Sequence, residues 1–321
     1  MSSSSGHKPS WPIRERPLRS HARMPDVKTA FLGLGLMGYP LAGHLNTQHP
    51  TLVWNRTHAK AEAHALEHGT RAVGNAGDAT DVDVLFTCLP TSLEVEQLMP
   101  HILETAKPGL IWVDCTSGDP ATSRGIASNL DARGVHFLDA PVSGGVGGAI
   151  KGQLTTMIGG DANVLETVRP VLESFAAKIV HCGPVGAGMA VKAGNQALLA
   201  VNILALGEVL LALEANGVTS ATALEVINAS SGRSNVSMNL FPERVVGRAF
   251  PATFALELMA KDVRIAIAML RESGTPSPVA HLTDNLIEIA RRELGGNVDH
   301  VAAVQLLERW AGHQLGLPLS D

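Results

Sequence analysis

The sequence TAFLGLGLMG (residues 29–38) joins a short apolar run to the pattern G-x-G-x-x-G, and a helical stretch follows it to about Gln48. In this pattern Gly33 permits a tight turn, Gly35 lets the backbone approach a pyrophosphate, and Gly38 allows the helix to pack closely on the strand. The start of the helix adds N–H donors and the positive end of the helix dipole. Strand, turn and helix together predict a dinucleotide site. The residues expected to hold the cofactor are Gly33, Leu34, Gly35, Leu36, Met37 and Gly38.

Strand-like and helical stretches alternate along the first half of the chain. The strand-like runs after the glycine turn are Thr51–Trp54, Val82–Leu89, Leu110–Asp114, Val135–Asp139, Leu154–Ile158 and Lys178–His181. Helical stretches lie between most of them, at Leu93–Thr105, Ala121–Arg133 and Asn163–Ser174. This alternation predicts an α/β domain with a largely parallel, doubly wound sheet.

The pattern changes after Gly188, where only helical periodicity remains. We predict a doubly wound domain over residues 27–186 and an all-helical domain over residues 187–321, which begins with a long interdomain helix. The glycine-rich segment Gly183–Gly188 is the expected hinge. Residues 1–26 are expected to form a disordered tail, because residues 1–23 lack apolar periodicity and their prolines argue against a targeting helix. The helical stretches are Met189–Asn216, Ala221–Ala229, Phe254–Glu272, Ser277–Glu293 and Val301–Trp310.

Composition excludes several classes of protein. The chain has 321 residues, 45% of them hydrophobic, which is too apolar for a disordered polypeptide and enough for two cored domains. A net charge of −5 leaves no basic excess to neutralise nucleic-acid phosphates. The longest apolar run, residues 197–215, contains Glu208 and Glu214, which favours a buried helix over a membrane span. Three cysteines fit a reducing compartment, so we expect a cytoplasmic protein. The net charge and the two glutamates lead us to expect no nucleic-acid partner and no membrane partner.

The end of the second strand indicates which dinucleotide binds. An NAD site usually has Asp or Glu there to hold the ribose hydroxyls, but this chain has Asn55-Arg56-Thr57. Arg56 can pair with a 2′-phosphate and stack on adenine, and Asn55 and Thr57 can hydrogen-bond the phosphate. We therefore predict NADP, with NAD as the alternative cofactor. An ordinary strand-end turn with a solvated arginine is the alternative structure.

Two later strand ends should reach the same crevice, because ligands bind beyond the carboxyl ends of parallel strands. One carries Leu89 and Pro90, and the other carries Ser117. Their small hydroxyl and apolar side chains suit a nicotinamide ribose and ring. Cys88 and Cys115, next to them, are expected to be small packing residues.

The segment Asp139–Gly145 follows another strand and contains Ser143-Gly144-Gly145. A hydroxyl beside consecutive unencumbered N–H groups makes a cradle for a carboxylate. The segment lacks the G-x-S-x-G pattern of many serine hydrolases, which disfavours that chemistry. A glycine-rich connecting turn is the alternative.

Lys192 and Asn195 share a face near the start of the long helix, because residues three apart on a helix are neighbours. Lys192 lies in an otherwise apolar stretch. Burial there would lower the pKa of the lysine and prepare it for proton transfer. Lys261 and Asp262 interrupt a later apolar helix and are a second place where charge can face a cleft. Solvated surface residues are the alternative at both places.

Four ordered motifs resemble those of the β-hydroxyacid dehydrogenases, specifically 3-hydroxyisobutyrate dehydrogenase. They are the glycine pattern, Asp139–Gly145, Gly186–Gln196 and Lys261-Asp262, and the resemblance covers about residues 27–312. It implies a Rossmann domain followed by an all-α domain. The pair Asn195-Gln196 departs from the Asn-Asn that usually follows the family's lysine. The implied roles are catalysis for Lys192, substrate binding for Ser143, Gly144, Gly145 and Asn195, and cofactor contact for Ser117, Lys261 and Asp262.

The resemblance implies an NADP- or NAD-dependent oxidoreductase that interconverts a small β-hydroxy acid and its semialdehyde. The first candidate is 3-hydroxyisobutyrate, an intermediate of valine catabolism, which gives methylmalonate semialdehyde. Reduction of glyoxylate, succinic semialdehyde or tartronate semialdehyde is the nearest alternative. Imine reductases typically have another residue in place of Lys192, and the Lys192–Asn195 pair argues against a non-catalytic NADP-binding protein. A homodimer or homotetramer is expected, because long helices can bury an exposed stripe against a second copy.

No metal is expected in this protein. His64 and His68 are four residues apart on a helical stretch, but no H-E-x-x-H pattern accompanies them. We expect a solvated histidine pair rather than a zinc site. Hydride transfer to nicotinamide requires no metal.

Overall fold

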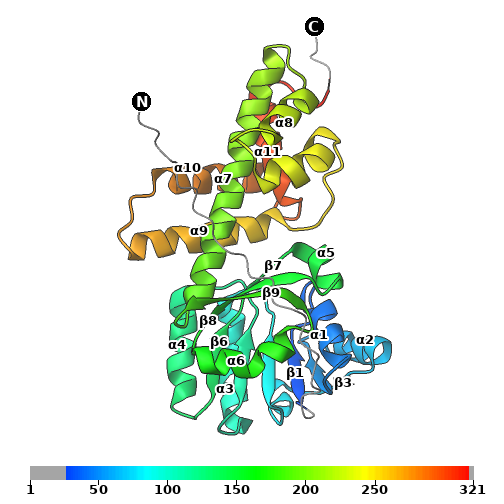
Figure 1. Ribbon diagram of the computed structural model, residues 1–321, viewed down its shortest axis with the longest axis vertical. Helices are drawn as coiled ribbons and strands as arrows, with labels where there is room; N and C mark the ends of the chain where they lie inside the picture. The colour runs from blue at the N-terminus through cyan, green and yellow to red at the C-terminus, as the bar shows by residue number, and fades with distance from the viewer. Residues whose placement is uncertain (1–26, 318–321) are drawn as a thin grey trace, which may run out of the picture.

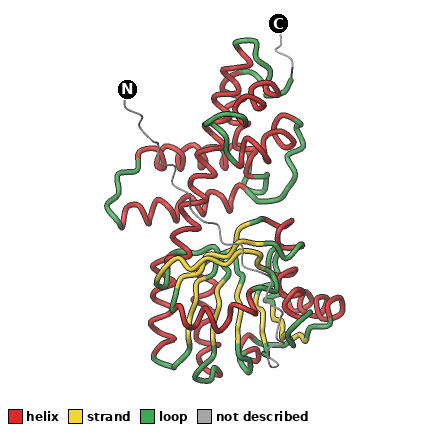
Figure 2. The backbone as a smooth tube through the Cα atoms, viewed as in Figure 1, coloured by secondary structure: helices red, strands yellow, loops and turns green. Residues whose placement is uncertain are grey.

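The computed structural model describes residues 27–317, which form two lobes (Figure 1). The lower lobe contains the strands, flanked by helices, and the described part of the upper lobe is helical (Figure 2). The tail expected over residues 1–26 lies outside the described residues, as do residues 318–321.

The lower lobe is built on one sheet in the order β3-β2-β1-β4-β5-β6-β8-β7, with β9 paired to β8. Strands β1 to β6 are parallel to one another, β8 runs antiparallel to β6 and β7, and β9 runs parallel to β8. The order 3-2-1-4-5-6 is that of a doubly wound Rossmann sheet, which confirms the predicted fold. The strands are β1 (Thr29–Leu32), β2 (Thr51–Trp54), β3 (Arg71–Ala72), β4 (Val84–Thr87), β5 (Ile111–Asp114), β6 (His136–Asp139), β7 (Val142–Ser143), β8 (Leu154–Gly159) and β9 (Ala176–Gly183).

Helices cover both faces of the sheet because the central strands are apolar on both sides. Phe31 of β1 lies in a core with α1, α2 and α6, whereas Leu32 lies in a core with α3 and α4. Such continuous apolar strands are typical of parallel sheets. The helices of this lobe are α1 (Gly38–Asn46), α2 (His58–His68), the 3₁₀ turn η1 (Ala76–Ala79), α3 (Ser92–Thr105), α4 (Pro120–Asp131), α5 (Gly145–Ile150) and α6 (Ala162–Leu172).

The upper lobe is organised around α7 (Ala187–Ala215), which leaves the sheet and runs up through the lobe (Figure 1). Ile203, Leu204 and Leu210 of α7 lie in one core with the other helices. Helix α7 is long and apolar enough to cross a membrane by length and composition alone, and half of its most apolar window is buried inside the protein. The other helices are α8 (Ser220–Asn228), η2 (Val236–Val246), α9 (Leu256–Glu272), α10 (Pro278–Leu294), η3 (His300–Ala303) and α11 (Val304–Ala311).

Several elements differ from those expected, and they include the unpredicted strand β7 and helix α5. Val236–Val246 forms a π-helical segment where the sequence predicted no helix, because Pro242 interrupts the helical pattern. The helix expected from Val301 begins as the 3₁₀ turn η3 and becomes α-helical only at Val304. Strand β3 was not predicted, because two residues are too few to show a period.

Candidate active site

The loops that carry the predicted motifs meet at one edge of the sheet. Leu32 pairs with Trp54 and with Thr87, Thr87 pairs with Asp114, and Asp114 pairs with Asp139. These residues end five neighbouring parallel strands, so the segments that follow them lie side by side. Ligands of doubly wound sheets bind at this edge.

The glycine loop leaves room for a phosphate at the start of α1. Gly33 has φ of 102°, and a Cβ there would lie 2.3 Å from the carbonyl oxygen of Cys88. A Cβ on Gly38 would lie 1.9 Å from the carbonyl oxygen of Gly33, so both positions require glycine. A Cβ on Gly35 would meet no described atom within 4 Å. Within the described residues, the side chain of the N-cap residue Met37 makes no hydrogen bond to the first turn of α1. The N–H groups of that turn could therefore bind a pyrophosphate.

Asn55 braces the glycine loop. Its Oδ1 accepts a hydrogen bond from the N–H of Leu34 at 3.0 Å, and its Nδ2 donates to the carbonyl of Thr57 at 3.1 Å. Leu34 is buried, whereas Leu36 is exposed, so the two leucines of the loop have different surroundings. Arg56 and Thr57 are exposed at the end of β2. A contact of these residues with a 2′-phosphate stays a prediction.

A buried network ties the ends of β4 and β5 together. Oδ1 of Asp114 accepts hydrogen bonds from Oγ1 of Thr87 at 2.8 Å and from the N–H of Thr116 at 3.1 Å. Oγ1 of Thr116 in turn accepts from the N–H of Leu89 at 3.0 Å. Burial raises the pKa of Asp114 to about 6 and that of the Cys88 thiol to about 12. Cys88 is therefore a packing residue at neutral pH, and the network fixes the backbone where the cofactor contact of Leu89 was expected.

Lys261 reaches from α9 to the same two loops. Its Nζ donates to the carbonyl oxygens of Ser117 at 2.6 Å and Pro90 at 3.2 Å. The same atom lies 3.2 Å from Oδ1 of Asp262. These contacts join the helical lobe to the sheet lobe. Lys261 therefore ties the lobes together beside the predicted cofactor residues Pro90 and Ser117, and its own contact with a cofactor stays a prediction.

Lys192 lies in the second turn of α7 and is half-buried. Its Nζ donates to Oε1 of Gln196 at 3.3 Å, and Nδ2 of Asn195 donates to the same oxygen at 3.1 Å. Nε2 of Gln196 donates to Oδ2 of Asp262 at 2.9 Å. Burial lowers the pKa of Lys192; Asp262 opposes this shift and Lys261 adds to it. The structure thus brings Lys192, Asn195, Lys261 and Asp262, from two helices, into one cluster.

Asp139 fixes where α7 begins. Its fully buried carboxylate, at the end of β6, accepts hydrogen bonds from the N–H groups of Gly186 at 2.6 Å and Met189 at 2.8 Å. Gly186 is the N-cap residue of α7 and has no side chain to cap the helix, so a carboxylate from the sheet takes that role. A Cβ on Gly188 would lie 2.8 Å from the same carboxylate. The glycine-rich segment expected to be a hinge is therefore held firmly at its helix end.

The predicted carboxylate cradle follows Asp139 closely. Ser143 ends β7 and is half-buried, opposite Thr155 of β8. Gly144 and Gly145 are exposed and have φ of 135° and 62°, conformations that favour glycine. Asp139 thus links two parts of the site, because the chain runs from it to Ser143 while its carboxylate holds the helix that carries Lys192.

The expectation of a solvated histidine pair is wrong for His64. This side chain is fully buried, with Nδ1 at 2.8 Å from Oγ1 of Thr70 and Nε2 at 3.0 Å from the carbonyl of Tyr39. Its ring lies 4.5 Å from that of His68. Aromatic neighbours, Tyr39 and His68, and partners for both ring nitrogens let this imidazole pack in the interior. Across residues 27–317 we find no group of three or more His, Cys, Asp or Glu that could hold a metal ion.

Sequence reasoning missed the roles of three polar residues, namely Gln196, Asp139 and Thr116. The sequence offered a signal for Gln196, because the pair Asn195-Gln196 departs from the family's Asn-Asn pair. Asp139 binds an amide 47 positions further along the chain, and no local pattern reveals such a contact. Thr116 accepts a hydrogen bond from the N–H of Leu89. The two residues are neighbours only because β4 pairs with β5.

Comparison with known proteins agrees with this arrangement. Residues 28–183 match the family described as the NAD-binding domain of 6-phosphogluconate dehydrogenase. Residues 186–307 match the family described as NAD-binding of NADP-dependent 3-hydroxyisobutyrate dehydrogenase. Together these two matches span nearly all of the described chain.

Similar proteins point to the same family. The 2-(hydroxymethyl)glutarate dehydrogenase of Eubacterium barkeri is 32% identical over 291 residues, which cover 89% of this chain and 97% of that protein. The NAD-dependent L-serine dehydrogenase of Pseudomonas aeruginosa is 33% identical over 275 residues, with coverages of 82% and 92%. The solved structure of Mycobacterium tuberculosis 3-hydroxyisobutyrate dehydrogenase with L-serine has a TM-score of 0.82 and 30% identity, and the match covers 88% of this chain and 99% of that one. The chain therefore belongs to the 3-hydroxyisobutyrate dehydrogenase family of β-hydroxyacid dehydrogenases and is an NAD(P)-dependent oxidoreductase.

Proposed function

We propose that the protein oxidises the hydroxymethyl group of a small carboxylate, with 3-hydroxyisobutyrate as the first candidate and NADP as the preferred cofactor. The observation that carries the proposal is Lys192, a half-buried lysine in the cluster with Asn195 and Asp262, whose pKa is lowered by burial. The names of the relatives support the substrate class. L-serine, 2-(hydroxymethyl)glutarate and 3-hydroxyisobutyrate each carry a hydroxymethyl group on the carbon next to a carboxylate.

The residues at the sheet edge fit a bound NADP. The open space at Gly35 and the start of α1 suit a pyrophosphate, and the exposed Arg56 suits a 2′-phosphate. Leu89, Pro90 and Ser117 would line the other end of the cofactor. A bound nicotinamide supplies the hydride acceptor.

Lys192 handles the proton in this proposal. The hydroxyl proton of the substrate must leave as the hydride is transferred, and a lysine with a lowered pKa can accept it at Nζ. Asn195 can hydrogen-bond the hydroxyl without adding charge. Ser143 and the amides of Gly144 and Gly145 would hold the substrate carboxylate and so orient the hydroxymethyl group.

The same residues support the reverse reaction. A protonated Lys192 can donate to the alkoxide that forms when an aldehyde is reduced. Reduction of glyoxylate, succinic semialdehyde or tartronate semialdehyde is therefore the second candidate. The segment Asn55-Arg56-Thr57 favours glyoxylate and succinic semialdehyde among these, because it resembles the NADP-preferring branch of the family that contains the reductases of those two aldehydes.

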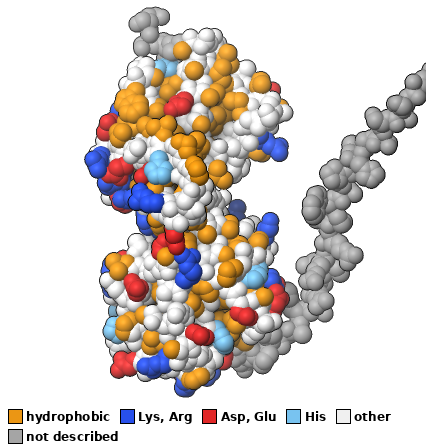
Figure 3. All heavy atoms as spheres, turned by 90° about the vertical axis from the view of Figure 1, so that its left-hand side faces the viewer, with side chains coloured by type: hydrophobic (Ala, Val, Ile, Leu, Met, Phe, Trp, Pro, Cys, Tyr) orange, Lys and Arg blue, Asp and Glu red, His pale blue; other side chains and the backbone are white. Residues whose placement is uncertain are grey.

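We also propose that the protein works in the cytoplasm as a homodimer or homotetramer. Leu198 and Val209 on α7 and Leu282 on α10 are exposed hydrophobic side chains. Hydrophobic side chains cover much of the upper lobe on the face shown in Figure 3. A second copy could cover them, and light scattering of the purified protein would measure the mass.

A panel of initial rates tests the proposed function. Each small hydroxy acid is offered with NADP and with NAD, and each semialdehyde with NADPH and with NADH. We expect carboxylates with a neighbouring hydroxymethyl group to react fastest, and NADP to be used better than NAD. If the protein binds NADPH but turns over no member of the panel, the proposed substrate class is wrong.

A further inference from the structure

Gln196 is a buried side chain whose amide makes hydrogen bonds through both its oxygen and its nitrogen. Only 5% of the residue is exposed. Its Oε1 faces two donors, Nζ of Lys192 and Nδ2 of Asn195, and its Nε2 faces the carboxylate of Asp262. The opposite orientation of the amide would place donor against donor and acceptor against acceptor. The hydrogen-bond partners therefore determine which amide atom is the oxygen and which is the nitrogen. Gln196 therefore connects a predicted catalytic lysine to a buried negative charge.

Asp262 is the anionic end of this connection. It is 3% exposed, and its other oxygen pairs with Nζ of Lys261, which in turn holds Ser117. The charged groups that act on Lys192 from α9 are Asp262 and Lys261. On the sheet side, Asp139 of β6 binds the first turn of α7, and Arg124 of α4 lies beside Gly186.

The length of the side chain matters. Gln196 bridges Lys192, one turn earlier on the same helix, and Asp262 on a different helix. An asparagine would withdraw the amide by one carbon–carbon bond, about 1.5 Å, and the bridge would open. The departure from the family's Asn-Asn pair therefore creates a connection that the shorter residue would not make with this backbone.

We propose that Gln196 is a positioning residue that holds Nζ of Lys192 and couples it to Asp262, and so sets the proton affinity of the catalytic amine. This inference rests on the proposed role of Lys192 as acid and base. An acceptor at the ammonium stabilises its charged form, so Gln196 keeps the pKa of Lys192 higher than burial alone would leave it. Loss of the amide should then lower the pKa of Lys192.

Gln196→Met tests the proposal, because methionine has a similar length and volume but makes no comparable hydrogen bond. Oxidation requires Lys192 in its neutral form. The kcat for oxidation therefore rises as the pH passes the pKa of Lys192. We expect this rise to move to lower pH by about one to two units, the size that follows from losing one hydrogen bond to a charged group. Gln196→Asn keeps an amide but loses the hydrogen bond to Asp262. For this variant we expect the rise in kcat to move to lower pH by a smaller amount.

Gln305→Met is the matched control, because Gln305 is a half-buried glutamine on α11, outside the site. We expect it to leave the pH profile unchanged. A wild-type profile in both Gln196 variants would overturn the proposal. Lys192→Ala separates this failure from that of the proposed function. If Lys192→Ala keeps the pH-dependent rise, the role of Lys192 is wrong; if it loses the rise while the Gln196 variants keep it, only the coupling is wrong.

Discussion

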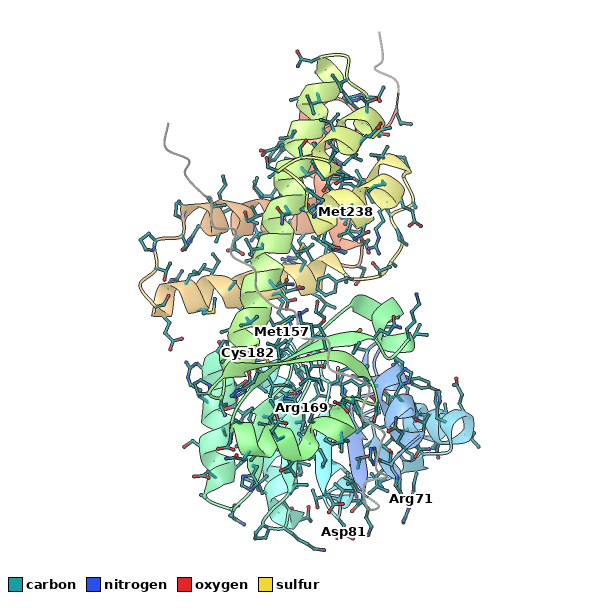
Figure 4. The ribbon with its side chains drawn as sticks, viewed as in Figure 1. Arg71, Asp81, Met157, Arg169, Cys182 and Met238 are labelled. Carbon is teal, nitrogen blue, oxygen red and sulfur yellow. The ribbon has the colours of Figure 1, made fainter. Side chains whose placement is uncertain are left out.

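Replacing Gly188 with alanine tests how firmly α7 is set against the sheet. Glycine to alanine inside a helix usually stabilises a protein by about 0.5–1 kcal/mol. At Gly188, however, the new Cβ would lie 2.3 Å from the carbonyl oxygen of Met157 and 2.8 Å from Oδ2 of Asp139. Met157, labelled in Figure 4, lies in β8 near the lower end of α7. Both neighbours are held in the sheet, so the start of the helix must move by about 1 Å to reach ordinary contact at 3.4 Å.

This displacement decides the sign of the effect. Overpacking costs about 1–3 kcal/mol, which exceeds the gain in helix propensity, so we expect a net loss of about 1–2 kcal/mol. The midpoint of thermal unfolding should fall by about 1–2 °C for each kcal/mol, because the entropy of unfolding grows with chain length. Because Lys192 follows one turn later, we also expect kcat to fall about 10²-fold. The glycine loop is untouched, so NADPH affinity should stay close to that of the wild type.

Gly194→Ala is the control in the same helix. A Cβ at Gly194 would meet no described atom within 4 Å, so this variant should gain about 0.5–1 kcal/mol. Differential scanning fluorimetry of both variants, with steady-state kinetics of Gly188→Ala, makes the comparison. A Gly188→Ala enzyme that is as stable as Gly194→Ala and fully active would refute the reasoning.

Two further predictions concern the cofactor and the substrate. Arg56→Ala should weaken NADPH far more than NADH, because the guanidinium pairs with the 2′-phosphate; equal losses of kcat/KM with both cofactors would remove this assignment. The methyl ester of 3-hydroxyisobutyrate should be a poor substrate, because a neutral ester loses the charge-assisted hydrogen bonds of Ser143 and the Gly144 and Gly145 amides. If the ester turns over like the acid, the carboxylate pocket is misassigned.

The sequence was sufficient for the fold because its strongest signals are local. Gly33 and Gly38 require glycine for steric reasons, and the apolar strands around them are buried on both faces. The break after Gly188 was equally clear, since α7 begins at Ala187 and no strand follows it within the described residues. Where local signals were weak, as in the π-helical segment around Pro242, the expected elements were incomplete.

The candidate site could be predicted only in part. Residue types and order pointed to Lys192, Asn195, Lys261 and Asp262, and the structure places these four in one cluster. The bridge through Gln196 depends on how α7 crosses α9, which no local pattern records. Burial was likewise hidden, and His64 shows the error that follows when a polar residue on an otherwise polar helix is assumed to be solvated.

The most direct test of the account is the turnover of Lys192→Ala. If Lys192 carries the proton, kcat should fall by about 10²–10⁴-fold while NADPH binding, followed by fluorescence titration, stays close to that of the wild type. Lys192→Arg should also be slow, because a guanidinium does not give up its proton at usable pH. A Lys192→Ala enzyme with kcat within about tenfold of the wild type would contradict the mechanism, since that loss is smaller than general acid–base catalysis provides.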